Sequence, residues 1–225
     1  MKALKLKVHQ QTVSYKKPYA QKVEDTYPLP PYSTILGLLH YIIGAKEYVG
    51  QSLRISVQGE ADGTGEVYNN SFFYKKLSTR DNASQPIYNN LLYDVNLIIH
   101  IAGDEDLLNK IYDNFFNKTL TLGKANDLVR VDEISFVNLT EINTGDIDED
   151  EDEYDILKHN AYIPKSSGIN LQGIAYNLNK RYEVFNELRV WKEKVLVNYV
   201  QANQMIDSGI YYKDDSKDKD LAFLY

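Results

Sequence analysis

The segment from Asp25 to His40 limits the folds open to this chain more than any other. Three prolines between positions 28 and 31 stiffen a loop, because each ring fixes its own φ and restricts the residue before it. The pattern then predicts a helix over 33–43 that Ser33 and Thr34 cap and that is apolar on nearly every face. Such a helix has to be buried, so its amino end is rigid, and a rigid helix start is a favourable place for a phosphate.

The hydrophobic periodicity of the first 140 residues predicts strands and helices in a recognisable order. The elements are a strand at 4–8, the helix at 33–43, strands at 53–57 and 93–101, a helix at 107–115 and a strand at 129–139. Glycines at 59, 63 and 65 predict a turn after the second strand. The β-α-β-β-α-β order is that of an α+β, ferredoxin-like (RRM or RAMP) domain, which we predict over 1–140.

The connection between the second and third predicted strands, residues 68–92, is too long and too polar for an ordinary hairpin turn. It interleaves aromatic rings with cations. This composition suits RNA, because rings stack on bases while cations hold phosphates. The alternative is an irregular surface loop whose rings pack against the body of the protein.

The last third of the chain divides into a loop and further strands. Residues 141–158 are interpreted as an acidic loop, and 159–225 as a C-terminal β-sheet extension packed on the same domain. A change of parity within the strand pattern of 184–200 predicts a hairpin or a bulge. Residues 214–220 alternate lysine with aspartate, which predicts a solvated tail, while the apolar residues 221–225 predict a docked end.

The formal charge of −7 argues at first against a nucleic-acid ligand. However, nine of the 32 acidic residues lie within 141–155, and without them 23 acids face 25 Lys and Arg residues. Residues 1–22 hold six lysines and no acid. Since a polyanion responds to charges within about 8–10 Å, the body of the chain remains able to bind RNA. The alternative is that these lysines solvate an ordinary surface.

Several kinds of chemistry find no support in the sequence. The lack of cysteine excludes disulfides and thiolate metal sites. The aspartates at 146, 148 and 150 have EF-hand spacing, but Glu151 and Leu157 stand where that motif needs Gly and Glu, so a solvated loop is predicted there. The four histidines are far apart and no catalytic or cofactor motif occurs, so we expect no metal and no cofactor. No apolar run is long enough to span a membrane, so a cytoplasmic protein is expected.

A series of motifs, taken in order, resembles one protein family. They are Ser14-Tyr-Lys-Lys-Pro-Tyr19, the segment Asp25 to Gly37, Leu122-Gly-Lys-Ala-Asn-Asp-Leu-Val129, and Gly173 to Phe185 with the strand-like 191–200 behind it. Together they resemble the Cas five family of CRISPR-associated proteins (RAMP superfamily) in its type I-B form, over residues 2–200. No motif is specific alone, so the resemblance depends on their order.

This resemblance implies a non-catalytic, RNA-binding subunit of a type I-B surveillance complex (Cascade) that acts in antiviral defence. Such a subunit binds and caps the 5′ handle of the CRISPR RNA (crRNA) and links the large subunit to the backbone subunits. The resemblance also implies that 68–92 is a protruding thumb-like hairpin that contacts the guide RNA and the adjoining backbone subunit. Contact with target DNA near the protospacer-adjacent motif stays open.

The candidate RNA-binding residues come from these motifs and from the rings and cations near them. Stacking on bases is assigned to Tyr15, Tyr19 and Phe73. Phosphate or sugar contacts are assigned to Lys16, Lys17, Ser33, the Thr34 amide region, Lys75, Lys76, Arg80, Lys124, Arg130 and Lys165. In the motif at 122–129, Gly123 would permit close backbone approach and Asn126 would meet RNA. The alternative for that motif is a plain turn between strands.

A second hypothesis is a metal-independent endoribonuclease that processes precursor crRNA, as relatives in type I-C systems do. That reaction needs a base for the ribose 2′-OH, an acid for the leaving group and a cation for the developing charge. Candidate groups are His40, Tyr41, Lys76 and the Lys158-His159 pair, although none of them matches a motif of the family. A third hypothesis is an RRM-like protein outside any CRISPR system.

Overall fold

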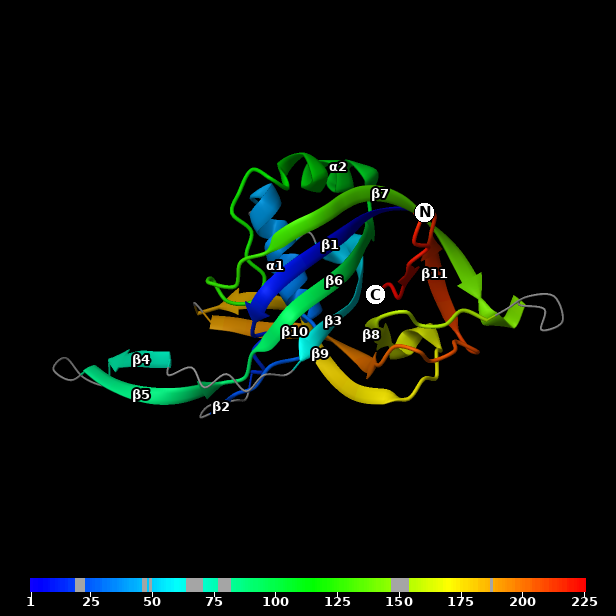
Figure 1. Cartoon of the computed structure of the whole chain (residues 1–225). Helices are drawn as coiled ribbons and strands as arrows, with labels where there is room; N and C mark the ends of the chain where they lie inside the picture. Colours follow the sequence, from blue (N-terminus) through cyan, green and yellow to red (C-terminus); the bar gives the residue numbers. More distant parts are fainter. Residues whose placement is uncertain are drawn as a thin grey trace.

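The computed structural model describes residues 1–18, 23–45, 48, 50–63, 71–76, 82–146, 154–186 and 188–225. Its strands are β1 Lys2–Val13, β2 Val23–Glu24, β3 Leu53–Gly63, β4 Ser71–Lys76, β5 Asn82–Asn89, β6 Leu92–Gly103, β7 Arg130–Asn143, β8 Asn160–Pro164, β9 Gly173–Phe185, β10 Leu188–Val200, β11 Ile210–Asp214 and β12 Leu221–Ala222. Its helices are α1 Tyr32–Ile43 and α2 Glu105–Asn114, with short 3-10 turns η1 Gly50–Ser52, η2 Thr144–Asp146 and η3 Lys165–Ser167. The strands form a nine-stranded sheet, β12-β11-β7-β1-β6-β3-β8-β10-β9, and a three-stranded sheet, β2-β5-β4 (Figure 1).

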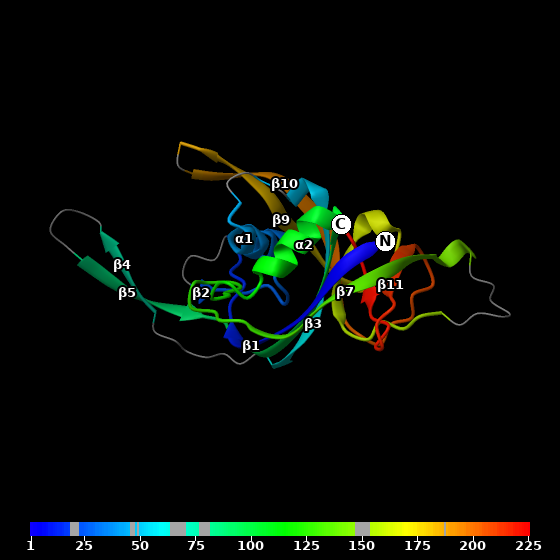
Figure 2. The same cartoon turned by 90° about the horizontal axis from the view of Figure 1, so that it is seen from above.

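The centre of the large sheet consists of β7-β1-β6-β3, which pair antiparallel throughout. Leu4, Leu6 and Val8 of β1 are buried in the same core as the apolar sides of α1 and α2, as their alternation with polar residues predicts. Figure 2 shows both helices on one side of β1 and β7. The result is an α+β fold dominated by antiparallel sheet, and the strands and helices predicted for 1–140 are present in the predicted order.

The predicted capping of α1 is wrong. The helix begins at Tyr32 with Pro31 as its N-cap residue, and no side chain donates or accepts a capping hydrogen bond. The backbone carbonyl of Pro31 accepts the N–H of Thr34 at 2.9 Å, so Ser33 and Thr34 lie inside the first turn. The helix starts earlier than the polar pattern predicts because the ring of Tyr32 is itself buried in the core.

The predicted turn is wrong at Gly59, because β3 continues through this residue and ends only at Gly63. An added Cβ at Gly59 would lie 2.3 Å from the carbonyl oxygen of Asn96 on β6. The glycine therefore permits a close approach between two paired strands, a role that glycine has inside strands as well as in turns. Gly65 lies outside the described residues.

Two β-hairpins extend beyond the body of the protein in Figures 1 and 2. β4 and β5 pair antiparallel and fall within the segment 68–92, while the side chains from 71 to 88 lie outside the described residues. β9 and β10 form the second hairpin, and their register shifts between Trp191 and Lys194. Of the two alternatives predicted for the parity change in 184–200, the bulge is therefore confirmed, and the hairpin turn lies between the end of β9 and the start of β10.

The C-terminal strands continue the large sheet at both edges. β8, β10 and β9 lie beyond β3, and β11 and β12 lie beyond β7. The division of the chain at residues 140 and 158 into three parts stays a prediction.

Residues 210–225, here called the C-terminal strap, span the central sheet. β11 pairs with β7 at one side, and Tyr225 exchanges two backbone hydrogen bonds with Ile55 of β3 at the other (3.0 and 3.2 Å). Between them, the N–H of Phe223 donates to Ser56 Oγ at 2.8 Å. The docked end predicted for 221–225 is therefore confirmed.

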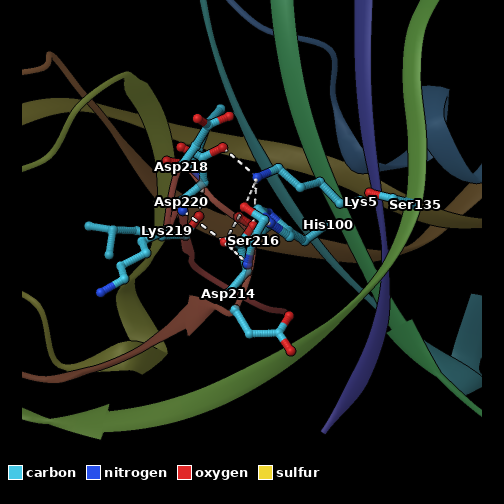
Figure 3. A network of polar contacts seen from close by, with 12 residues as sticks. Lys5, His100, Ser135, Asp214, Ser216, Asp218, Lys219 and Asp220 are labelled. Carbon is cyan, nitrogen blue, oxygen red and sulfur yellow. Dashed lines mark hydrogen bonds and ion pairs between the residues drawn. The ribbon is translucent and has the colours of Figure 1, made fainter.

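The solvated tail predicted for 214–220 is wrong at its two end residues, which are buried, whereas most of the residues between them are exposed. Both Asp214 and Asp220 contact Lys5 of β1, with Nζ–Oδ2 distances of 2.7 and 2.6 Å (Figure 3). His100 Nε2 of β6 lies 3.1 Å from the same Asp214 oxygen. Lys5 and His100 alternate with core residues of their strands, so they point away from the helices. Buried charges require partners, and the strap supplies them.

No helix in the described part of the chain is long and apolar enough to cross a membrane.

Candidate nucleic-acid interface

A cavity of about 480 Å³ lies between the start of α1 and the β9–β10 hairpin. Four of the predicted RNA-binding residues line it, namely Lys16, Ser33, Thr34 and Gly123. The other lining residues were not predicted to bind RNA, and they include Tyr27, His40, Tyr41, Asn179, Tyr182 and Trp191. The fold therefore brings the proline-braced helix start, the 122–129 motif and the second hairpin to one place.

The loop that carries Gly123 is held in place by the buried side chain of Gln10 and the half-buried side chain of Asp127. Gln10 donates from Nε2 to the carbonyl of Leu122 at 2.9 Å, and its Oε1 accepts from the hydroxyl of Tyr15 at 2.6 Å. Asp127 Oδ2 accepts the backbone N–H of Lys124 at 2.7 Å. Each end of the motif is thus fixed to β1 or to itself, which gives the cavity a defined wall.

Gly123 itself has a conformation that favours glycine. Its φ is +115°, and an added Cβ would lie 2.6 Å from Asp127 Oδ2 and 3.0 Å from Val13 Cγ2. The close backbone approach predicted for this residue is therefore made to the protein's own Asp127 and Val13.

Tyr15 was predicted to stack on a base, but its ring is 2% exposed and its hydroxyl is bonded to Gln10. The ring is unavailable for stacking in this conformation. Tyr15 follows the end of β1, where the chain still packs into the core, and an alternation pattern does not reveal where such packing stops.

The lysines near the cavity are bonded to carboxylates of the chain. Glu24 receives Lys16 Nζ on Oε1 at 2.5 Å and Lys124 Nζ on Oε2 at 2.6 Å. Lys17 Nζ donates to Asp25 Oδ2 at 2.7 Å. Burial opposes ionisation of Glu24, but the hydrogen bonds from Lys124 and Lys16 outweigh it and lower the pKa of the carboxyl.

Aromatic rings form the opposite wall. Tyr182 of β9 faces Trp191 of β10, and their ring centroids lie 5.6 Å apart in an edge-to-face arrangement. Tyr27 packs edge-on against Tyr176 at 5.5 Å, and Lys17 Nζ lies within 6 Å of both rings. Rings beside a cation suit the stacking of a nucleic-acid base. The sequence signal for this wall is the single tryptophan of the chain, which lies in an alternating strand.

His40 and Tyr41 lie at the α1 side of the cavity. His40 is half-buried, and this burial lowers the pKa of its imidazole, so the ring is neutral at neutral pH. Tyr41 is half-exposed, and Lys118 Nζ lies 4.6 Å from its ring centroid. An imidazole and a phenol hydroxyl thus line the same cavity as Lys16.

The comparison with known proteins settles the family. The family model described as "CRISPR-associated protein (Cas_Cas5)" matches residues 3–201. The chain belongs to this family. The resemblance that the motifs indicate is therefore confirmed at the level of the family.

Two solved structures share the fold of this CRISPR-associated protein. One, described as "CRISPR RNA-guided surveillance complex", has 12% identity and a TM-score of 0.57, and the match covers 90% of this chain and 91% of that chain. The other, a CRISPR protein from Archaeoglobus fulgidus, has 12% identity and a TM-score of 0.51, with coverage of 99% and 98%. No curated protein sequence matches the chain.

The remaining predicted site residues of this CRISPR-associated protein lie away from the cavity or outside the described residues. Asn126 is exposed in the 122–129 motif, Arg130 donates to Asp132 at 2.7 Å, and Lys165 is exposed in η3. Tyr19 and Arg80 lie outside the described residues, as do the side chains of Phe73, Lys75 and Lys76.

The Lys158-His159 pair lines a different cavity of about 490 Å³, together with Lys7 and Asp218. Lys158 Nζ donates to the carbonyl of Asp218 in the strap at 2.6 Å. The structure thus separates this pair from His40 and Tyr41, which line the first cavity. Among the described residues, no group of His, Asp or Glu side chains is arranged to hold a metal ion.

Proposed function

We propose that this protein is a non-catalytic subunit of a type I-B CRISPR surveillance complex (Cascade). In this role it binds and caps the 5′ handle of the crRNA and links the large subunit to the backbone subunits in the cytoplasm. The observation that carries the proposal is the cavity in which the start of α1, Lys16 and the Tyr182–Trp191 pair meet. Membership of the family and the fold shared with a chain of a CRISPR RNA-guided surveillance complex support it.

The architecture supports the same role. The order β7-β1-β6-β3, with both helices on one face, supports a ferredoxin-like assignment. The strap covers part of the opposite face, which favours RNA binding on the helix side, where the cavity lies. In this proposal the β4–β5 hairpin is the thumb that reaches the guide RNA and the adjoining backbone subunit.

Within the cavity, the polar and the aromatic side chains have different proposed roles, which follow from their chemistry. Lys16 and the hydroxyls of Ser33 and Thr34 contact phosphate or sugar oxygens, while Trp191 and Tyr182 stack on a base. A cavity of this size suits one or two nucleotides of an unpaired end.

The test is a binding and cross-linking experiment with the full-length protein. We expect a labelled RNA that carries the 5′ handle to bind more tightly than the same RNA with a shuffled handle, and ultraviolet cross-links to map to Tyr182 or Trp191. Lys16→Glu should weaken binding, while Lys110→Glu, the same change on an exposed position of α2, should not. Equal affinity for both RNAs, or cross-links confined to the strap, would contradict the proposal.

A metal-independent endoribonuclease is the second candidate, and the neutral His40 beside Tyr41 and Lys16 favours it. A neutral imidazole can accept the proton of a ribose 2′-OH while a lysine stabilises the developing negative charge. Incubating the protein with labelled repeat RNA in EDTA separates the two candidates. A discrete product that His40→Ala abolishes would establish the enzyme, and intact RNA would reject it.

A further inference from the structure

The lysines at the RNA cavity are already paired with acids before any ligand arrives. Lys16 and Lys124 share Glu24, and Lys17 is bonded to Asp25. The side chain of Glu24 is 2% exposed, whereas those of Lys16 and Lys124 are 43% and 37% exposed. The carboxylate therefore lies beneath two ammonium groups that remain open to solvent.

The main chain at both acids is fixed by hydrogen bonds, and the Asp25 carboxylate accepts one more from the backbone. The carbonyl of Glu24 accepts the N–H of Asn90 at 2.9 Å, and the carbonyl of Asp25 accepts the N–H of Lys17 at 2.9 Å. Asp25 Oδ1 also accepts the N–H of Thr26 at 2.9 Å. With the backbone fixed in this way, the acids stay close to the cavity when a polyanion approaches.

The charge balance at the cavity is therefore small. In these ion pairs three lysines face two carboxylates, so the paired groups together carry one net positive charge rather than three. Sequence-independent RNA affinity comes mainly from cations that neutralise phosphates. A lysine that already contacts a carboxylate gains less from a phosphate, because the repulsion between phosphate and carboxylate offsets part of the attraction.

We infer that Glu24 and Asp25 determine specificity by acting as internal counter-charges that suppress sequence-independent RNA binding at this cavity. Discrimination between RNAs is a difference of affinities. The two acids increase this difference because they weaken RNAs that bind through phosphate contacts alone more than an RNA whose 5′ end is also held by stacking on the aromatic wall. Recognition of the correct 5′ end then depends on the aromatic wall and the polar groups of α1. The inference rests on the proposed function, since it concerns the same cavity.

The test uses two variants of nearly equal shape, Glu24→Gln and Asp25→Asn, in the full-length protein. Affinity for a shuffled RNA should rise about three- to tenfold in each variant, with a smaller gain for the handle RNA. The logarithmic salt dependence should steepen by about 0.7 for each lysine released. Glu105→Gln is the matched control, because it removes the same charge from an exposed pair with Lys2 and should change neither value.

The results of this test show whether Glu24 and Asp25 suppress RNA binding or have another role. Weaker binding of both RNAs would mean that the acids position the lysines, and unchanged binding would mean that they play no part; either result overturns the inference. If Glu24→Gln unfolds, Asp25→Asn decides alone, since that side chain is 45% exposed. Failure of the proposed function is separate, because the unmodified protein would then show no preference for the handle RNA.

Discussion

Lys5 holds two carboxylates of the strap in a place that water does not reach. Its position in an alternating strand predicts an exposed lysine, and the alternation is correct about which face it occupies. What the local sequence does not reveal is that a segment more than 200 residues away covers that face. The lysine–aspartate alternation of the strap looks solvated for the same reason, because a local pattern carries no information on tertiary partners.

Replacing Lys5 by methionine should lower the free energy of unfolding by about 3–5 kcal/mol, since it leaves Asp214 and Asp220 buried without their cation. Urea denaturation followed by circular dichroism measures the loss. The control is Lys7→Met, which removes an ion pair with the exposed Asp218 and should cost about 1 kcal/mol or less. Losses of equal size would show that burial of the Lys5 cluster is unimportant.

If the cavity beside α1 binds the handle RNA as proposed, Trp191→Ala should weaken that binding by about 1–3 kcal/mol, because it removes a stacking surface. Fluorescence anisotropy of a labelled RNA measures the change. Phe185→Ala is the comparison, because this ring is exposed near the tip of the same hairpin and does not line the cavity. A similar loss in both variants would argue against a stacking role for Trp191.

At the scale of elements, the periodicity of the sequence predicts the strands and helices of residues 1–140 and the bulge in the second hairpin. The sequence pattern predicts the wrong structure where a residue type occurs in more than one structural role, as glycine and proline do here. Gly59 lies inside a strand because β3 and β6 approach closely there, and Pro31 starts α1 in place of the expected hydroxyl caps. Of the cavity, the sequence predicts the helix start and the 122–129 motif, but not the hairpin wall that packing brings to them.

The motif at 122–129 gives a matched pair of glycine substitutions. Gly123→Ala should destabilise the protein by about 1–3 kcal/mol, because its φ of +115° and the 2.6 Å approach to Asp127 both disfavour a Cβ. Gly37→Ala in α1 meets no atom within 4 Å and should stabilise by up to about 1 kcal/mol, because alanine favours the helix. Thermal unfolding compares the two, and a stabilising Gly123→Ala would refute the steric argument.

For the whole molecule, family motifs reveal the fold because they lie in order along most of the chain, whereas the strap belongs to no such motif.

The strap also makes stability depend on pH. Burial opposes ionisation of Asp214, but hydrogen bonds from His100, Lys5 and Ser216 hold the pKa of its carboxyl far below the ordinary value. The pKa values of Glu24 and Asp25 are lowered as well, by their lysine partners against the effect of burial.

A carboxyl with a lowered pKa stabilises the folded state above its unfolded pKa of about 4 and loses that contribution as the pH falls toward the folded value. The midpoint of urea unfolding should therefore decrease steadily between pH 5 and pH 2. Asp214→Asn should lower stability at pH 7 and flatten this decrease, because the titrating group is gone. A variant whose stability falls with pH as steeply as that of the unmodified protein would show that Asp214 does not contribute.

The strap also has a consequence for how the protein is made. On the ribosome, the first strand emerges with a lysine whose acidic partners are still unsynthesised, and at about 5–20 residues per second they follow roughly 10–40 s later. The nascent sheet meanwhile presents an unneutralised cation and an uncovered face to the cell. Completion of the native state thus waits for translation of the final segment, and the earlier strands need protection from misassembly until then.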